Sequence, residues 1–288
     1  GLFFSSDRFT RPGPGVRPDA PRKKGVARLA EIMGRDMWNF FRAGFLAFLG
    51  CLPFIIGMFF AVETHALLFM LLAGIIGGLI AGPELSAMAD TVLRSLRDEP
   101  GYWWETYRRV WKRNARESLV PGMLTGLVLS MQIFTLFHMS VISAGIVTWV
   151  LLILSFVVTL GLESYIWPQI ALLDLPLYGI LKNSLLLFLG YLPRSLGAIA
   201  IKAVYWGAIL LFFPLTTIIL PFTNFWLPML PALLCIYQPL NKCFTIESTI
   251  NKMREDELNA ALAKDNEPLP EDPTEKAEES TDASSDVQ

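Results

Sequence analysis

Positively charged residues are absent from three long apolar stretches of the chain. No Lys or Arg occurs within 43–93, 117–181 or 203–241. A membrane-spanning helix needs roughly 20 apolar residues, so each stretch holds, or nearly holds, two spans. Runs such as 66–83 and 141–162 have no polar face, which a soluble helical protein would need to show to water. The pattern therefore favours a membrane protein over a soluble helical one.

The predicted fold is an all-α, polytopic transmembrane helical bundle of about six spans in three hairpins. Strict two-residue alternation is absent, which excludes the strands of a membrane barrel. Proline recurs in the last hairpin, so we expect the sixth span to be bent or partly unwound. Five spans are the alternative, if one hairpin arm is re-entrant. The predicted spans are 39–61, 66–81, 119–137, 141–162, 196–213 and 215–239.

Two segments between the spans have the pattern of cytosolic amphipathic helices. Gly82-Pro83 is expected to break the second span, and the segment from Pro83 to Arg97 to leave the membrane at a slant. The second segment follows the fourth span. We expect its apolar stripe to lie at the membrane–water interface and its helix to stop at Leu192-Pro193. The stripe consists of Leu177, Ile180, Leu181, Leu185 and Phe188.

Charge along the chain predicts its orientation and its domains. The turns predicted to lie outside hold no Lys or Arg, so both termini should be cytoplasmic in a multi-pass protein of the cytoplasmic membrane. The start of the chain is basic and its end is acidic and rich in Pro and Ser, a composition that cannot bury enough apolar surface to fold. The predicted domains are a basic cytosolic segment (1–37), the transmembrane domain (38–243), a cytosolic helix (244–264) and a disordered acidic tail (265–288).

A basic and aromatic segment precedes the third span. Aromatic rings with a polar edge favour the lipid headgroup level, and a basic face favours anionic lipid. Nucleic acid is the rival partner for such a segment, and a position between two membrane hairpins argues against it. The candidate docking or interfacial residues are Trp103, Trp104, Tyr107, Arg108, Arg109, Trp111, Lys112, Arg113 and, after the fourth span, Arg194.

Three glycines recur at four-residue spacing in the second span: Gly74, Gly78 and Gly82. On a helix they share one face and allow a neighbouring backbone to approach closely. Ordinary helix packing is the favoured interpretation, and a pore-lining or sliding helix is the alternative. Gly122 and Gly126 repeat the pattern in the third span.

Polar groups at membrane depth are functional candidates by default. We single out Lys202, Glu163, Asp90 and Asn224. The charged candidates lie within two or three turns of the predicted cytosolic face, where snorkelling and water explain them. Lys202 is the most suspect, and a buried ion pair with Glu163 or with Asp90 is the alternative interpretation. The two histidines lie at predicted outer turns, and the three cysteines have no metal-ligand spacing. No hydrolase, nucleotide-binding or metalloprotease motif occurs, so we expect no enzyme activity, metal or cofactor.

A set of short motifs is distributed along the chain: Gly82-Pro83, Asp98 to Trp103, Tyr107 to Asn114, Tyr165 to Pro168, Leu181 to Ser184 and Leu192 to Arg194. Together they resemble the YesL-like family of bacterial membrane proteins, a family of unknown function. The likeness covers roughly 30–245, although the family has a shorter connection between its Leu-Pro and Gly-Pro elements, so the span count is taken from this chain. Members often occur beside sugar ABC-transport genes, so the resemblance implies a bacterial membrane protein with an accessory role in carbohydrate uptake.

These observations leave three function classes. The leading hypothesis is a non-enzymatic accessory or regulatory partner of a carbohydrate ABC uptake system, with ABC permease subunits and the lipid bilayer as partners. The alternative is a small-solute channel or transporter that uses the proline-rich last hairpin. A membrane-embedded enzyme is a third, disfavoured class.

Overall fold

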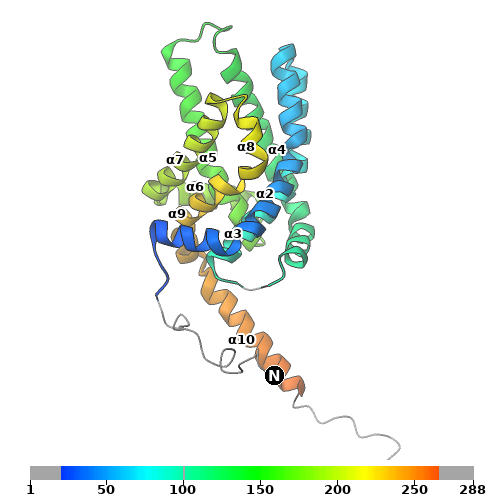
Figure 1. The fold of residues 1–288 in the computed structure, drawn as a ribbon, viewed down its shortest axis with the longest axis vertical. Coiled ribbons are helices and arrows are strands. Elements are labelled where there is room, and N and C mark those ends of the chain that lie inside the picture. Colours follow the sequence, from blue (N-terminus) through cyan, green and yellow to red (C-terminus); the bar gives the residue numbers. More distant parts are fainter. Residues whose placement is uncertain (1–20, 100, 266–288) are drawn as a thin grey trace, which may run out of the picture. The chain divides into compact units, whose positions relative to one another are not determined.

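The computed structural model describes residues 21–99 and 101–265, and every regular element in them is an α-helix. The chain divides into two compact units, Gly1–Pro239 and Leu240–Gln288. The predicted all-α fold is confirmed. In chain order (Figure 1), the helices are α2 (Gly25–Thr64), α3 (Leu67–Leu96), α4 (Trp103–His138), α5 (Ile146–Leu172), α6 (Leu177–Gly190), α7 (Leu192–Leu211), α8 (Thr216–Thr223), α9 (Trp226–Phe244) and α10 (Ile246–Asp265).

Among these helices, α2, α3, α4, α5 and α7 are each long and apolar enough to cross a membrane. Helices α8 and α9 pass the same test together, although the chain bends by 54° between them. Counting that pair as one broken span gives six, the predicted number. The protein is therefore a multi-pass helical bundle, and the last span is bent as its prolines predict.

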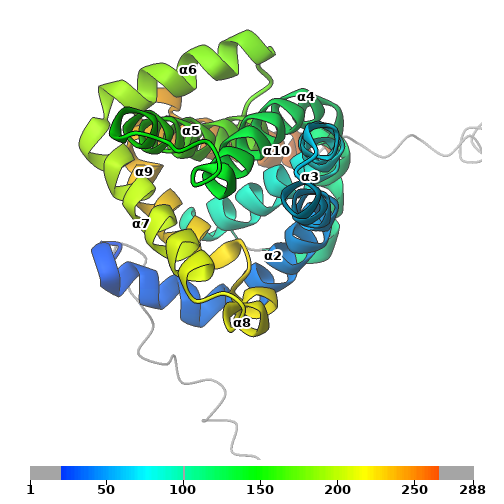
Figure 2. The same cartoon turned by 90° about the horizontal axis from the view of Figure 1, so that it is seen from above.

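The long helix α2 changes direction along its length. Its N-terminal part lies across one end of the bundle, and the rest runs along α3 (Figures 1 and 2). The sequence placed residues 25–37 in a cytosolic segment and began the first span at residue 39. The structure instead joins both in one uninterrupted helix. This places charged residues of α2 over the end of α3.

Helices α3 and α4 pack closely along their glycines. A Cβ atom added to Gly74, Gly78 or Gly82 would overlap the backbone or a side chain of α4. From the other side, Gly122 and Gly126 meet Gly78 and Gly74 in the same way. The glycines of α3 thus lie in close contact with the backbone of α4, as small residues do where membrane helices pack together.

The predicted break at Gly82-Pro83 is wrong, because α3 continues through Pro83 to Leu96. Proline removes one hydrogen bond from a helix, but close packing of Gly82 against Ser118 of α4 holds this turn in place. The amphipathic, slanted segment predicted after Pro83 is also wrong. Residues 86–93 are buried on every side, and their polar side chains bond mainly within α3. Ser86 and Thr91 donate to the carbonyls of Pro83 and Ala87, and Asp90 accepts from Arg94.

Helix α6 is a shorter apolar helix that lies against the outside of α5 (Figure 2). Its predicted apolar stripe is divided between two environments. Ile180 and Phe188 are buried, whereas Leu181 and Leu185 are exposed. A helix with apolar residues on both faces, too short to span, suits the edge of a membrane.

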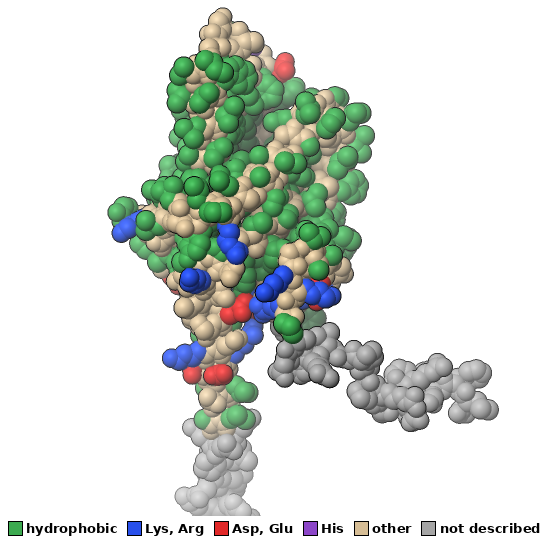
Figure 3. Space-filling model, turned by 90° about the vertical axis from the view of Figure 1, so that its left-hand side faces the viewer, with side chains coloured by type: hydrophobic (Ala, Val, Ile, Leu, Met, Phe, Trp, Pro, Cys, Tyr) green, Lys and Arg blue, Asp and Glu red, His purple; other side chains and the backbone are tan. Residues whose placement is uncertain are grey.

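Charged side chains gather toward one end of the first unit, and hydrophobic side chains cover most of the rest of the face that Figure 3 shows. In the second unit, α10 is exposed along 251–263, and its bounds are close to those of the helix predicted at 244–264. The predicted acidic tail beyond residue 265, and the chain before residue 21, lie outside the described residues.

Candidate functional site

Asp98, in the turn between α3 and α4, is held by three arginines. Arg22 Nε lies 3.0 Å from Asp98 Oδ2, Arg28 Nη2 lies 2.8 Å from the same oxygen, and Arg35 Nη1 lies 2.5 Å from Oδ1. Burial by itself raises the pKa of Asp98, but the hydrogen bonds from Arg35 and Arg28 outweigh it, so the pKa lies below its ordinary value. The turn is thereby fastened to the N-terminal part of α2.

Two of these arginines also donate hydrogen bonds to the last carbonyl groups of helix α3. The last carbonyls of a helix have no partner within it and carry partial negative charge. Arg28 donates to Leu96 O at 3.2 Å and Arg35 donates to Ser95 O at 2.7 Å. The crossing part of α2 therefore acts as a side-chain cap for α3.

A second set of ion pairs lies on the other side of this turn. Arg94 Nε lies 2.7 Å from Asp90 Oδ2, and Arg94 Nη1 lies 3.1 Å from Glu99 Oε2. Arg97 Nη2 lies 2.8 Å from the same Glu99 oxygen. The side chains of Asp90 and Arg97 are almost fully buried, and buried charges are tolerated when they are paired. Asp90, predicted as a functional candidate, is thus part of a compensated network.

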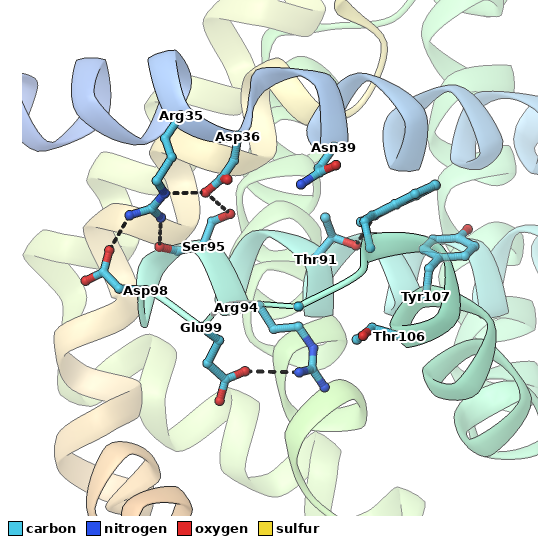
Figure 4. Close-up of a pocket in the computed structure, with 12 residues that line it drawn as sticks. Arg35, Asp36, Asn39, Thr91, Arg94, Ser95, Asp98, Glu99, Thr106 and Tyr107 are labelled. Carbon is cyan, nitrogen blue, oxygen red and sulfur yellow. Dashed lines mark hydrogen bonds and ion pairs between the residues drawn. The ribbon is translucent and has the colours of Figure 1, made fainter. Parts of the chain in front are cut away.

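A cavity of about 290 Å³ lies between these ion pairs (Figure 4). Helix α2 forms one wall, the end of α3 and the following turn form another, and the start of α4 closes it. The lining combines ion pairs, small polar side chains and two aromatic rings. Its residues are Arg35, Asp36, Asn39, Thr91, Arg94, Ser95, Asp98, Glu99, Gly101, Trp103, Thr106 and Tyr107.

The aromatic residues predicted to lie at the interface form a stripe on α4 whose side chains point in two directions. The stripe consists of Trp103, Trp104, Tyr107 and Trp111. Tyr107 Oη and Trp111 Nε1 donate hydrogen bonds to the two carboxylate oxygens of Glu84 on α3. Trp103 Nε1 donates to Thr91 Oγ1 at 3.2 Å, and Trp104 alone is largely exposed. Most of the stripe therefore binds polar groups of α3 and does not face outward.

The basic residues of the same helix do face outward. Arg108, Arg109, Lys112 and Arg113 are exposed, as is Arg116. None of them forms an ion pair with a described acidic residue. Arg108 lies over the Trp104 ring at 5.8 Å, and Arg113 Nη2 donates to Ala171 O at the end of α5. We call Arg108, Arg109, Lys112, Arg113 and Arg116 the basic face of α4.

Arg194, the last predicted docking residue, turns toward α9. Its Nη1 donates to Cys235 O at 3.2 Å and its Nη2 to Gln238 Oε1 at 2.5 Å. It lies on α7, away from the basic face of α4 in the sequence, and it joins α7 to α9. The contacts of Arg194 are therefore with another helix of the same chain.

Lys202 and Glu163, two of the predicted polar groups in the membrane, lie together. Lys202 Nζ on α7 is 3.6 Å from Glu163 Oε1 on α5, and both side chains are largely buried. Of the two acidic partners considered for Lys202, the structure selects Glu163. This pair links α5 to α7 where a lone charge would be costly.

Asn224 lies at the break between α8 and α9 with a positive φ of 34°. Its Nδ2 donates to Pro221 O, and its Oδ1 accepts from Trp226 N. Tyr205 Oη of α7 donates to its carbonyl oxygen at 2.6 Å. Gly44 of α2 allows the close approach, since a Cβ there would overlap the Asn224 amide. The polar groups of the break are thus satisfied within the chain.

The two histidines, placed separately at outer turns by the sequence, meet in the structure. His65 Nδ1 and His138 Nε2 are 2.7 Å apart, and His138 Nδ1 lies 2.7 Å from Phe134 O. A carbonyl accepts only, so His138 donates from Nδ1. In the neutral pair, His65 therefore donates to His138 Nε2. This contact joins the end of α2 to the end of α4.

Among the described residues, no group of three or more His, Cys, Asp or Glu side chains could hold a metal ion. Comparisons with protein-family models, curated proteins and solved structures found no match.

Proposed function

We propose that this chain is a non-enzymatic, multi-pass protein of the bacterial cytoplasmic membrane that acts through a partner at the basic face of α4. The partner proposed is a permease subunit of a carbohydrate ABC uptake system, which this protein assists or regulates. Both termini lie in the cytoplasm. The outer turns, 139–145 among them, hold no Lys or Arg, which supports this orientation.

The observation that carries the proposal is the contrast between two groups of arginines. The inward arginines, such as Arg28, Arg35 and Arg94, each bind acidic side chains. The basic face of α4 lies nearby in sequence and is exposed, without a described acidic partner. Like charges on adjacent turns repel one another. A face of this kind is stabilised by an acidic surface or by anionic lipid next to the membrane.

The partner class rests on the resemblance to YesL-like proteins together with this face. An accessory protein needs a surface close to the membrane that a permease can reach. The basic face is such a surface, because it continues directly into the apolar part of the same helix α4. Anionic lipid would bind there in the absence of the partner.

Charge reversal of Arg108, Arg109 and Lys112 to Glu tests the proposal. Arg113 is left intact because it also bonds to α5. We expect the tagged wild-type chain to co-purify with ABC permease subunits from native membranes and the variant to lose them. Lys182→Glu, on the exposed face of α6, is the control. Unchanged recovery of permease subunits with the variant would refute the docking role of this face.

Reversing basic residues next to a span can also disturb topology, so a second variant separates the two effects. Arg108, Arg109 and Lys112 are changed to Gln, and a reporter fused after Gln288 reports the side of the membrane. We expect a cytoplasmic reporter together with loss of the partner. A periplasmic reporter in the wild-type chain would contradict six spans.

A small-solute channel or transporter remains the second candidate function. The broken span α8–α9 favours it, since transporters place substrates at discontinuous helices. Against it, the carbonyls around Asn224 already accept hydrogen bonds from the chain itself. Reconstituted vesicles decide between the two: solute flux through the purified protein alone would replace the accessory role with transport.

A further inference from the structure

We propose that the cavity between α2, α3 and α4 binds a neutral, polyhydroxylated small molecule of the size of one sugar ring. The inference goes beyond the proposed docking face, because the cavity and the basic face use different residues. It rests on three properties of the lining: its charge balance, its unused hydrogen-bonding groups and its aromatic wall.

Every charged side chain of the cavity lining is ion-paired, and Asp98 and Glu99 also bind Arg28 and Arg97 outside the lining. Arg35 binds Asp36 at 2.8 Å and Asp98 at 2.5 Å. Arg94 binds Glu99 at 3.1 Å. A charged ligand would add an uncompensated charge to groups that are already paired. A neutral ligand can enter without that cost.

Several lining groups have hydrogen-bonding capacity left over. The hydrogen bonds to Asp36 reach only its Oδ2, so Oδ1 remains an acceptor. Arg94 uses Nε and Nη1, so Nη2 remains a donor. The side chains of Asn39 and Thr106 lie at the cavity (Figure 4) and form no hydrogen bond with another described residue. The unused set contains both donors and acceptors.

A ligand rich in hydroxyl groups matches such a mixed set, because each hydroxyl donates one hydrogen bond and accepts others. The apolar wall fits the same ligand class. The rings of Trp103 and Tyr107 line the cavity with their centroids 5.0 Å apart. Aromatic rings can pack against the C–H faces of a sugar, while the polar groups fix its orientation. Glycerol-like polyols and monosaccharides share this chemistry.

Calorimetric titration of the purified full-length chain in detergent tests the inference without any partner protein. The probes are glucose and sorbitol as neutral polyols, glucose 6-phosphate as an anion and serine as a zwitterion. We expect saturable binding of a neutral polyol and weaker or no binding of the other two. Tighter binding of glucose 6-phosphate or serine, or no saturable polyol binding, would overturn the inference.

Variants locate the binding. Asn39→Ala and Thr106→Val should each weaken polyol affinity by about tenfold, the effect of one lost hydrogen bond. Thr106→Ser, which keeps the hydroxyl, should restore it. Asn183→Ala on α6 and Thr148→Val on α5 are matched controls away from the cavity. If both cavity variants bind the polyol as tightly as the wild type does, with unchanged melting temperatures, the ligand binds elsewhere. The same follows if the control variants lose as much polyol affinity as the cavity variants. Because no permease is present, failure of the docking proposal leaves this result unaffected.

Discussion

Arg28 Nη2 donates hydrogen bonds to both carboxylate oxygens of Asp98, at 2.9 Å and 2.8 Å. The Arg28 side chain is almost fully buried, and the two residues are 70 positions apart in the chain. The same nitrogen also donates to Leu96 O. One arginine thus connects the N-terminal part of α2 to the end of α3 and to the turn that follows.

Replacing Asp98 with Asn should destabilise the protein. The change leaves Arg28 and Arg35 without their shared carboxylate in a partly buried site, and a lost charged hydrogen bond costs about 1.5–3 kcal/mol. Thermal unfolding in detergent, followed by circular dichroism, measures the effect. Glu105→Gln on the exposed side of α4 is the matched control and should unfold as the wild type does. Equal melting temperatures for all three proteins would contradict the role of Asp98.

Stability should also depend on pH through Asp98. Its pKa is lower in the folded protein than in the unfolded chain, so the folded state favours the ionised carboxylate. The resulting stabilisation is fully present above the unfolded pKa, which is about 3.9. It is lost as the pH falls through the lower, folded pKa. The melting temperature of the wild type should therefore fall more steeply in acid than that of Asp98→Asn, and parallel curves would refute this.

Two glycines should respond in opposite ways to the same substitution. Gly78→Ala places a methyl group against the backbone of α4, and overpacking of this kind costs about 1–3 kcal/mol. Gly34→Ala in α2 meets open space and should gain up to about 1 kcal/mol from helix propensity. Melting temperatures of the two variants test the packing of α3 on α4. A Gly78→Ala protein as stable as Gly34→Ala would show that the helices do not approach so closely.

Local sequence pattern was enough to predict the spans. The Lys- and Arg-free stretches contain most of the apolar length of α2, α3, α4 and α5, whereas α7 carries Arg194 and Lys202. The prolines of the last hairpin flank the bend between α8 and α9. These features depend on residues near one another in the chain. The prediction of a helix break at Pro83 was wrong, because Gly82 packs against Ser118, a residue distant in the chain. This packing outweighs the local tendency of proline to end a helix.

The candidate site was harder to predict, because its residues come from distant segments. Asp98 was named only as the start of a motif, and nothing local indicates that Arg28 and Arg35 bind it. Tyr107 and Trp111, which donate to Glu84, were interpreted as lipid-facing. Their four-residue spacing puts both on one side of α4, and that spacing next to a buried carboxylate was the available signal.

Site-specific photo-crosslinking in native membranes tests the central claim most directly. A photoreactive residue replaces Arg109 on the basic face of α4 or, as a control, Leu151 on the exposed apolar side of α5. The account predicts an adduct with an ABC permease subunit, identified by mass spectrometry, from position 109 and not from position 151. The absence of a permease adduct at position 109, or the same adduct from both positions, would contradict it.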